Sequence, residues 1–190
     1  MTLNIKVKSG STEPSKRPPP GDRRGTAIVS PGRTNPADLP VYITRDCHSQ
    51  ILAYARRGGE FEVGGFLLGG YHVWAGHRYV DIDVQVPALK AKSAKTHLTF
   101  SNDAQREFHA IAAQRYPDKL VLGWVHSHPG YSVFLSEYDL FIQRGFFASP
   151  HHVAVVVDPY QHAPQDRVGV FVWEEGKVSA GYHLIVYERG

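Results

Sequence analysis

Two histidines and an aspartate in the second half of the chain have the types and spacing of a metal site. His126 and His128 alternate at the end of an apolar stretch, residues 120–125, that is expected to form a strand. In a strand, side chains two residues apart point to the same side, so both imidazoles can converge on one ion. A short loop can then bring Asp139 back to the same point. Two nitrogens and one carboxylate oxygen suit Zn²⁺ and leave its fourth position for water, which is the layout of a catalytic site.

Each of these residues could also have a structural role that involves no metal. The chain contains 11 histidines, so a His-x-His pair alone could be structural. Asp139 could be an acid in the first turn of a helix over residues 137–146, where it would complement the helix dipole. Ser136, three residues earlier, could be the N-cap of that helix. The fixed offsets of Ser136 and Asp139 from the histidine pair favour the metal site.

The motif His126-x-His128, seven further residues and then Ser136-x-x-Asp139 resembles the signature of the JAMM (MPN-plus) zinc metallo-isopeptidase family. The resemblance covers residues 39–190. Three stretches look especially like the deneddylase of the COP9 signalosome and the deubiquitinase of the proteasome lid: 123–131, 135–139 and 153–159. The short chain looks like a compact prokaryotic member of this family.

The resemblance implies a role for each matched residue. The zinc ligands would be His126, His128 and Asp139. The family pattern Glu-x-x-Gly-x-Leu-x-Gly places Glu62, rather than Glu60, as the catalytic general base, and the Ser136 hydroxyl would hydrogen-bond the oxyanion. Without the resemblance, Glu62 could be a solvated acid at the end of a strand. Some members carry an additional zinc near a turn that here spans residues 160–167 and offers only His162, so we expect one zinc per chain.

A mixed α/β domain of the α+β type is expected to position these residues. Apolar stretches predict strands over residues 41–44, 63–68, 80–86, 120–125, 153–157, 168–173 and 181–187. Helices are predicted over 45–57 with Thr44 as N-cap, from Asn102 with a capping box to Gln105, and over 137–146. We therefore expect a central mixed sheet flanked by helices. The resemblance implies the MPN/JAMM architecture, which is cytidine-deaminase-like.

The first 38 residues differ in composition from the rest. They are rich in Pro, Ser, Gly and Arg, and such a composition cannot bury enough apolar surface to offset the entropy of ordering. We expect residues 1–38 to be a flexible, basic, Pro-rich tail and residues 39–190 to be the catalytic domain. Residues 1–36 carry a net charge of +5, which leaves −2 on the remainder. Because the excess of positive charge lies outside the domain, the sequence argues against nucleic acid as a partner.

Three features bear on the location of the chain. No apolar run approaches the roughly 20 residues that cross a bilayer. The N-terminus lacks the apolar core and cleavage site of a secretory signal. The single cysteine, Cys47, cannot form an internal disulfide. We expect a cytoplasmic protein with no membrane partner.

The resemblance implies a zinc-dependent isopeptidase or peptidase that cleaves after the C-terminal glycine of a ubiquitin-like modifier. Its expected partners are a ubiquitin-like protein or its conjugates, together with E1- and E2-like pathway enzymes. The loop over residues 87–100 lies where the family has its first insertion; its lysines could meet an acidic modifier or simply be solvated. The alternatives are a catalytically silent MPN scaffold and a DNA-associated protein of the same fold.

Overall fold

The computed structural model describes residues 13–32, 39–95, 97–163, 167–182 and 184–190. The helices in these residues are α1 (Arg45–Arg57), α2 (Asn102–Arg115) and α3 (Glu137–Phe146). The strands before α2 are β1 (Ser15–Lys16), β2 (Thr26–Ser30), β3 (Val41–Thr44), β4 (Gly64–Trp74), β5 (His77–Pro87), β6 (Lys92–Ser93) and β7 (Leu98–Thr99). Those after it are β8 (Leu120–Ser127), β9 (Val153–Val157), β10 (Val168–Glu174), β11 (Lys177–Tyr182) and β12 (Ile185–Arg189).

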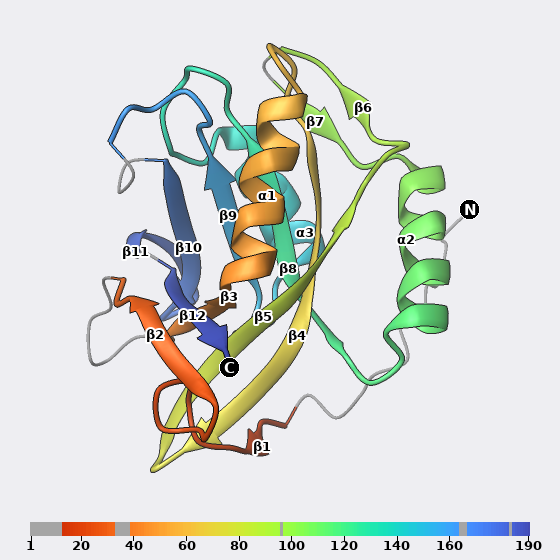
Figure 1. The fold of residues 1–190 in the computed structure, drawn as a ribbon. Coiled ribbons are helices and arrows are strands. Elements are labelled where there is room, and N and C mark those ends of the chain that lie inside the picture. Colours follow the sequence, from red (N-terminus) through yellow and green to blue (C-terminus); the bar gives the residue numbers. More distant parts are fainter. Residues whose placement is uncertain (1–12, 33–38, 96, 164–166, 183) are drawn as a thin grey trace.

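A curled mixed sheet forms the centre of the molecule. Its strand order is β11-β10-β9-β8-β4-β5-β3-β12-β2, and β1 pairs with β4. The pairs β8–β9, β3–β5, β3–β12 and β1–β4 are parallel and the others are antiparallel. Helix α1 lies across one face, while α2 and α3 lie on the other (Figure 1). The predicted α+β class is confirmed. None of the described helices is long and apolar enough to cross a membrane.

The face under α1 is closed by the helix that follows β3. Thr44 caps this helix, because its hydroxyl accepts a hydrogen bond from the backbone N–H of Cys47 at 3.3 Å. The buried side of the helix presents Cys47, Ile51 and Ala55 to apolar side chains of the sheet. The helix ends at Gly58. The predicted helix 45–57 and its N-cap are confirmed.

The opposite face packs aromatic side chains against α2 and α3. Phe66 of β4 stacks on Phe108 of α2, with ring centroids 4.0 Å apart, and this cluster includes Trp124. The N-cap of α2 is Ser101, whose hydroxyl accepts from the backbone N–H of Ala104 at 3.1 Å. The predicted capping box of Asn102 and Gln105 is therefore wrong, because Ser101 takes the N-cap position and Asn102 is already the first residue of the helix.

Strands β4 and β5 form one long hairpin rather than the shorter strands predicted at 63–68 and 80–86. The turn between them is Ala75-Gly76, and both residues have positive φ, 48° and 84°. That geometry matches the twist of a tight hairpin. Two further predictions differ from the structure. The predicted loop 87–100 contains the small β6–β7 hairpin. The predicted strand 181–187 is not one strand, because β11 ends and β12 begins within it.

The N-terminal segment from residue 13 to residue 32 lies on the sheet, which differs from the flexible tail predicted for residues 1–38. Strand β1 pairs with β4, and β2 pairs with β12 at the sheet edge. The Arg23 guanidinium forms a buried salt bridge to Asp81 at 2.9 Å and lies over the Tyr187 ring. The Tyr79 hydroxyl bonds the segment's backbone. These long-range polar contacts, together with strand pairing and the burial of Pro20, order a Pro- and Arg-rich segment. Residues 1–12 and 33–38 lie outside the described residues, and the domain boundary stays a prediction.

Candidate metal centre

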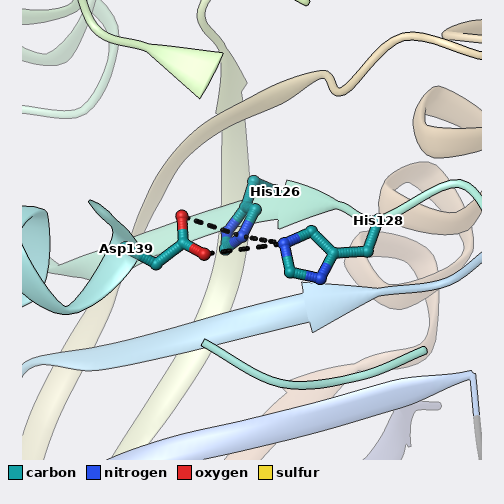
Figure 2. A group of neighbouring side chains, drawn as sticks. All are labelled: His126, His128 and Asp139. Carbon is teal, nitrogen blue, oxygen red and sulfur yellow. Dashed lines mark hydrogen bonds and ion pairs between the residues drawn. The ribbon is translucent and has the colours of Figure 1, made fainter. Parts of the chain in front are cut away.

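The histidine pair lies at the end of a central strand. His126 is within β8, and His128 follows its last residue. Strand β8 lies between β4 and β9, and the backbone N–H of His128 donates to the carbonyl of Val157 at 2.8 Å, which continues the β8–β9 pairing. Asp139 comes from the first turn of α3. Figure 2 shows the two imidazoles and the carboxylate pointing toward one another from these separate elements.

The three side chains approach each other at distances that suit one ion. The two histidine Nε2 atoms are 3.0 Å apart. Asp139 Oδ1 is 3.3 Å from His126 Nε2, and Oδ2 is 3.6 Å from His128 Nε2. Zinc bonds of about 2.0–2.1 Å in a tetrahedron place ligand atoms about 3.3–3.4 Å apart. All three side chains are buried, and among the described residues they form a group whose ligand atoms lie within 4.8 Å of one another. The donor set therefore fits zinc.

The protonation of these groups also suits metal binding. Burial lowers the pKa of His126, and the neighbouring Asp139 carboxylate acts in the opposite direction. Burial acts to raise the pKa of Asp139, but hydrogen bonds from His126, His128 and Ser136 outweigh it and hold that pKa well below its usual range. A neutral imidazole and an ionised carboxylate are the forms that bind a metal.

Aromatic contacts hold the two imidazole rings in place. Trp124 stacks on His126 with ring centroids 4.5 Å apart, and its Nε1–H donates to Gln143 Oε1 at 2.8 Å. The Phe134 ring lies 4.7 Å from that of His128. Neither histidine Nδ1 has a hydrogen-bond partner among the described residues. These aromatic contacts, stacked for His126 and tilted for His128, therefore orient the rings, as a hydrogen bond to the second nitrogen often does at metal sites.

Glu62 lies beside the three-residue group. Its Oε1 is 3.8 Å from His128 Nε2, while Oε2 has no partner among the described residues. Burial raises the pKa of Glu62 to about 7, with His128 opposing the shift and Asp139 adding to it. Its backbone N–H donates to the carbonyl of Ala94 at 2.8 Å, and Ser93 Oγ donates to its carbonyl. The residues around β6 thus fix the position of this carboxylate.

Glu60 is placed differently. Its carboxylate is exposed and paired with Lys95 at 2.9 Å, away from the three-residue group. The structure therefore brings Glu62, rather than Glu60, to the histidines. The alternative that Glu62 is a solvated acid is wrong, because its side chain is only 4% exposed.

Ser136 and Asp139 form the capping box of α3. Ser136 Oγ accepts from the backbone N–H of Asp139 at 3.2 Å and donates to Asp139 Oδ2 at 2.6 Å. The backbone N–H of Ser136 donates to the same Oδ2 at 2.8 Å. Asp139 thus caps the helix through Oδ2 while Oδ1 lies nearest His126. The two explanations that the sequence left open for Asp139 and Ser136 are compatible in one geometry.

Three further residues of types that can act in catalysis or bind metals, Cys47, His151 and His152, are not part of this group. Burial, with a smaller contribution from Asp83, raises the pKa of Cys47 to about 12, which makes it a poor nucleophile. His151 and His152 precede β9, and His151 stacks on Tyr71.

The sequence alone did not single out three residues that hydrogen-bond around these side chains: Ser93 to the Glu62 carbonyl, Gln143 to Trp124, and Asp158 to the backbone N–H of Gly130. Ser93 and Gln143 lack a distinguishing sequence pattern, because each acts through a partner more than 15 residues away. Asp158 lies in the stretch 153–159 that resembles known proteins, and that match was the available signal.

Comparisons with known proteins agree with this geometry. Residues 44–175 match the family described as prokaryotic homologs of the JAB domain. A solution structure of a protein from Desulfitobacterium hafniense matches with a TM-score of 0.56 and 23% identity, covering 78% of this chain and 94% of that chain. At that identity the likeness concerns the fold alone.

Curated relatives share the central part of the chain. The 26S proteasome regulatory subunit RPN11 of Eremothecium gossypii is 33% identical over 123 residues, which cover 64% of this chain and 38% of that protein. The ubiquitin carboxyl-terminal hydrolase RPN11 of Saccharomyces cerevisiae is 32% identical, covering 64% and 39%. COP9 signalosome complex subunit 5 of Candida glabrata is 28% identical, covering 68% and 29%. The chain spans less than half the length of these relatives.

Proposed function

Because this chain belongs to the family of prokaryotic homologs of the JAB domain, we propose that it is a zinc-dependent isopeptidase or peptidase of the JAMM type. The proposed reaction is hydrolysis after the C-terminal glycine of a ubiquitin-like modifier, which frees the modifier from a conjugate or a precursor. One observation carries this proposal: two imidazoles and a carboxylate converge in a buried site with a second carboxylate, Glu62, beside them.

Each side chain of the site has a defined task. His126, His128 and Asp139 would hold one zinc ion. When bound, zinc supplies Lewis acidity, which lowers the pKa of water from 15.7 to about 7 and polarises a carbonyl. Glu62 lies beside the ligands, and its pKa of about 7 lets it accept a proton from water and return it to the departing amine near neutral pH. No covalent intermediate with the protein is required.

Ser136 has a more demanding task. Its hydroxyl proton is directed to Asp139 Oδ2 at 2.6 Å. To stabilise the oxyanion, the hydroxyl must rotate away from that carboxylate while its oxygen continues to accept from the backbone N–H of Asp139. Such rotation is local, so the helix cap is preserved during the reaction.

Exposed aromatic side chains near the site suit an extended peptide substrate. Phe61 precedes Glu62, Phe134 contacts the His128 ring, and Tyr138 precedes Asp139; all three are exposed to solvent. Exposed aromatic side chains can bind a flexible polypeptide tail, and Phe134 is the one of these three that contacts a histidine of the site. The Saccharomyces cerevisiae relative is a ubiquitin carboxyl-terminal hydrolase by name, which supports a ubiquitin-like substrate. A cytoplasmic setting with E1- and E2-like partners is the natural extension of this proposal.

The two alternatives make different predictions. A silent scaffold would bind a modifier or another subunit without hydrolysing it. A DNA-associated protein would use the basic N-terminal segment, in which the Arg23 guanidinium is buried against Asp81 while Arg17 and Arg24 are exposed. The buried group of two imidazoles and a carboxylate with Glu62 beside it favours the hydrolase.

The test combines metal analysis with cleavage of ubiquitin-like proteins that end in Gly-Gly and carry a C-terminal fluorogenic amide. We expect about one zinc per chain and release of the fluorophore. Glu62→Gln should retain zinc and lose about 10²–10⁴-fold in kcat, because the general base is removed. Glu60→Gln is the matched control, since Glu60 is an exposed glutamate two residues away. Undiminished cleavage by the Glu62 variant, or a zinc-free protein, would contradict the proposal.

A further inference from the structure

Asp158, directly after β9, has a fully buried carboxylate that accepts four hydrogen bonds. Oδ1 accepts from the backbone N–H groups of Gly130 and Tyr160, each at 3.0 Å. Oδ2 accepts from the backbone N–H of Ser132 and from Gln161 Nε2, each at 2.9 Å. A buried carboxylate is costly unless it is paired or fully hydrogen-bonded, and here backbone donors replace a cation.

These four bonds join two separate loops. Gly130 and Ser132 belong to the loop between His128 and the N-cap of α3, so this loop connects two of the candidate ligands. Tyr160 belongs to the loop that follows β9. Its hydroxyl extends to a third segment, where it donates to the carbonyl of Gly59 at 3.2 Å. Gly59 lies three residues before Glu62.

The loop between His128 and α3 has a backbone conformation that requires stabilising contacts. Ser132 has φ of 72°, in the left-handed region that a non-glycine residue adopts at an energetic cost. The next residue, Val133, packs directly against Gly169 of β10: a Cβ at Gly169 would lie 2.1 Å from Val133 Cγ1. Phe134 then reaches the His128 ring. The loop is thus fixed at successive residues before the chain enters α3 with Asp139.

We propose that Asp158 is a positioning residue that sets the approach of Asp139 and Ser136 to the histidine pair and, through Tyr160, supports the segment that carries Glu62. The inference rests on the proposed function for its catalytic consequence, but the positioning itself is a property of the metal-free fold. Asp158 lies outside the group of ligand atoms and would act only through the loops it holds.

The variant Asp158→Asn tests this inference with little change of shape. An amide nitrogen would replace one oxygen and face N–H donors, so at least one loop loses its acceptor. We expect zinc affinity, measured by competition with a chelator, to fall about tenfold or more, as for supporting residues at other metal sites. In the metal-free protein, the backbone amides of Ser136 and Asp139 should exchange with solvent faster.

Two controls separate positioning from a loss of stability. Ile82→Ala removes a fully buried side chain of β5 that packs under α1, so it lowers the melting temperature without contacting the loops. It should leave zinc affinity and the exchange of Ser136 and Asp139 unchanged. Tyr160→Phe keeps Asp158 and removes only the bond to Gly59. It should lower kcat about twofold to fivefold while zinc affinity stays constant.

The outcomes are distinguishable. The inference is overturned if Asp158→Asn is folded and keeps both the parent zinc affinity and the parent exchange rates, or if Ile82→Ala at equal loss of melting temperature weakens zinc equally. If the parent protein binds no zinc, the proposed function fails, and the exchange rates of the metal-free variants still decide whether Asp158 positions the loop. If Asp158→Asn does not fold, an unchanged kcat in Tyr160→Phe overturns the link to Glu62.

Discussion

Replacing Ser136 with alanine and, separately, with glycine should separate its two tasks. Both variants remove the hydroxyl that donates to Asp139 Oδ2 and accepts from the backbone N–H of Asp139. Losing an N-cap hydroxyl costs about 1 kcal/mol for alanine but only about a few tenths of a kcal/mol for glycine. We therefore expect the glycine variant to be the more stable of the two.

The catalytic effect should not follow that difference in stability. Removing one oxyanion donor costs about 10²–10³-fold in kcat. Because the hydroxyl must first leave Asp139, we expect the lower end of that range, about 100-fold, and the same value for both variants. Zinc affinity should change little, since the backbone N–H of residue 136 still donates to Asp139 Oδ2 at 2.8 Å.

The assay measures kcat with the fluorogenic modifier amide, zinc affinity by chelator competition and stability by urea unfolding. Ser101→Ala is the matched control, because Ser101 caps α2 in the same way at 3.1 Å and is not among the residues of the metal centre. It should lose about 1 kcal/mol and no activity. If kcat of Ser136→Gly stays within about threefold of the parent, the oxyanion role is refuted and Ser136 is a helix cap only.

Two further predictions concern charged groups. Arg23→Met should lower the free energy of unfolding by about 3–5 kcal/mol, because it leaves the buried Asp81 carboxylate without its cationic partner and with only the Tyr187 hydroxyl as a side-chain donor. Zinc affinity should not change. Urea unfolding measures the loss of stability, with the exposed neighbour variant Arg24→Met as the control. Equal stabilities of the two variants would contradict the prediction. Burial acts to raise the pKa of Asp158, but hydrogen bonds led by the Gly130 N–H hold it below its usual range. This carboxylate therefore stabilises the fold above its unfolded pKa, about 3.9, and that contribution is lost as pH falls through the lower folded pKa. The metal-free Asp158→Asn variant should lose less stability between pH 5 and pH 3 than the parent, and an identical slope would refute the assignment.

The sequence predicted that His126, His128 and Asp139 converge, and the structure agrees, because these residues are close in the chain; their role as zinc ligands stays a prediction. His126 and His128 share a strand, and the cap at Ser136 fixes where α3 begins, so the ligand spacing has a local cause. Two predicted elements were also correct because their signals are local. A capping residue marks the start of the helix over 45–57, and a continuous apolar run marks the strand Val153–Val157. Glu62 required the resemblance, since nothing local distinguishes it from Glu60.

The features that the sequence did not predict depend on distant partners. The order of residues 13–32 depends on Arg23 meeting Asp81, 58 positions later. From composition alone, an arginine is expected to be solvated, so the buried Asp81 carboxylate that it contacts could not be predicted. Gln143 contacts the candidate metal centre only through Trp124. Asp158 acts through backbone N–H groups, which every residue except proline has, so the residue types do not reveal these bonds. The extension of β4 and β5 depends on pairing along both edges of the hairpin.

The pairing of β2 with β12 bears on the behaviour of the protein in concentrated solution. Without residues 26–30, the outer side of β12 would present free backbone donors and acceptors beside the apolar side chains of Ile185, Val186 and Tyr187. Bare edges of this kind recruit strands from neighbouring molecules and lead to aggregation. Residues 26–30 thus cover this edge of β12 and make β2 the last strand of the sheet, a structural role separate from that of the candidate metal centre.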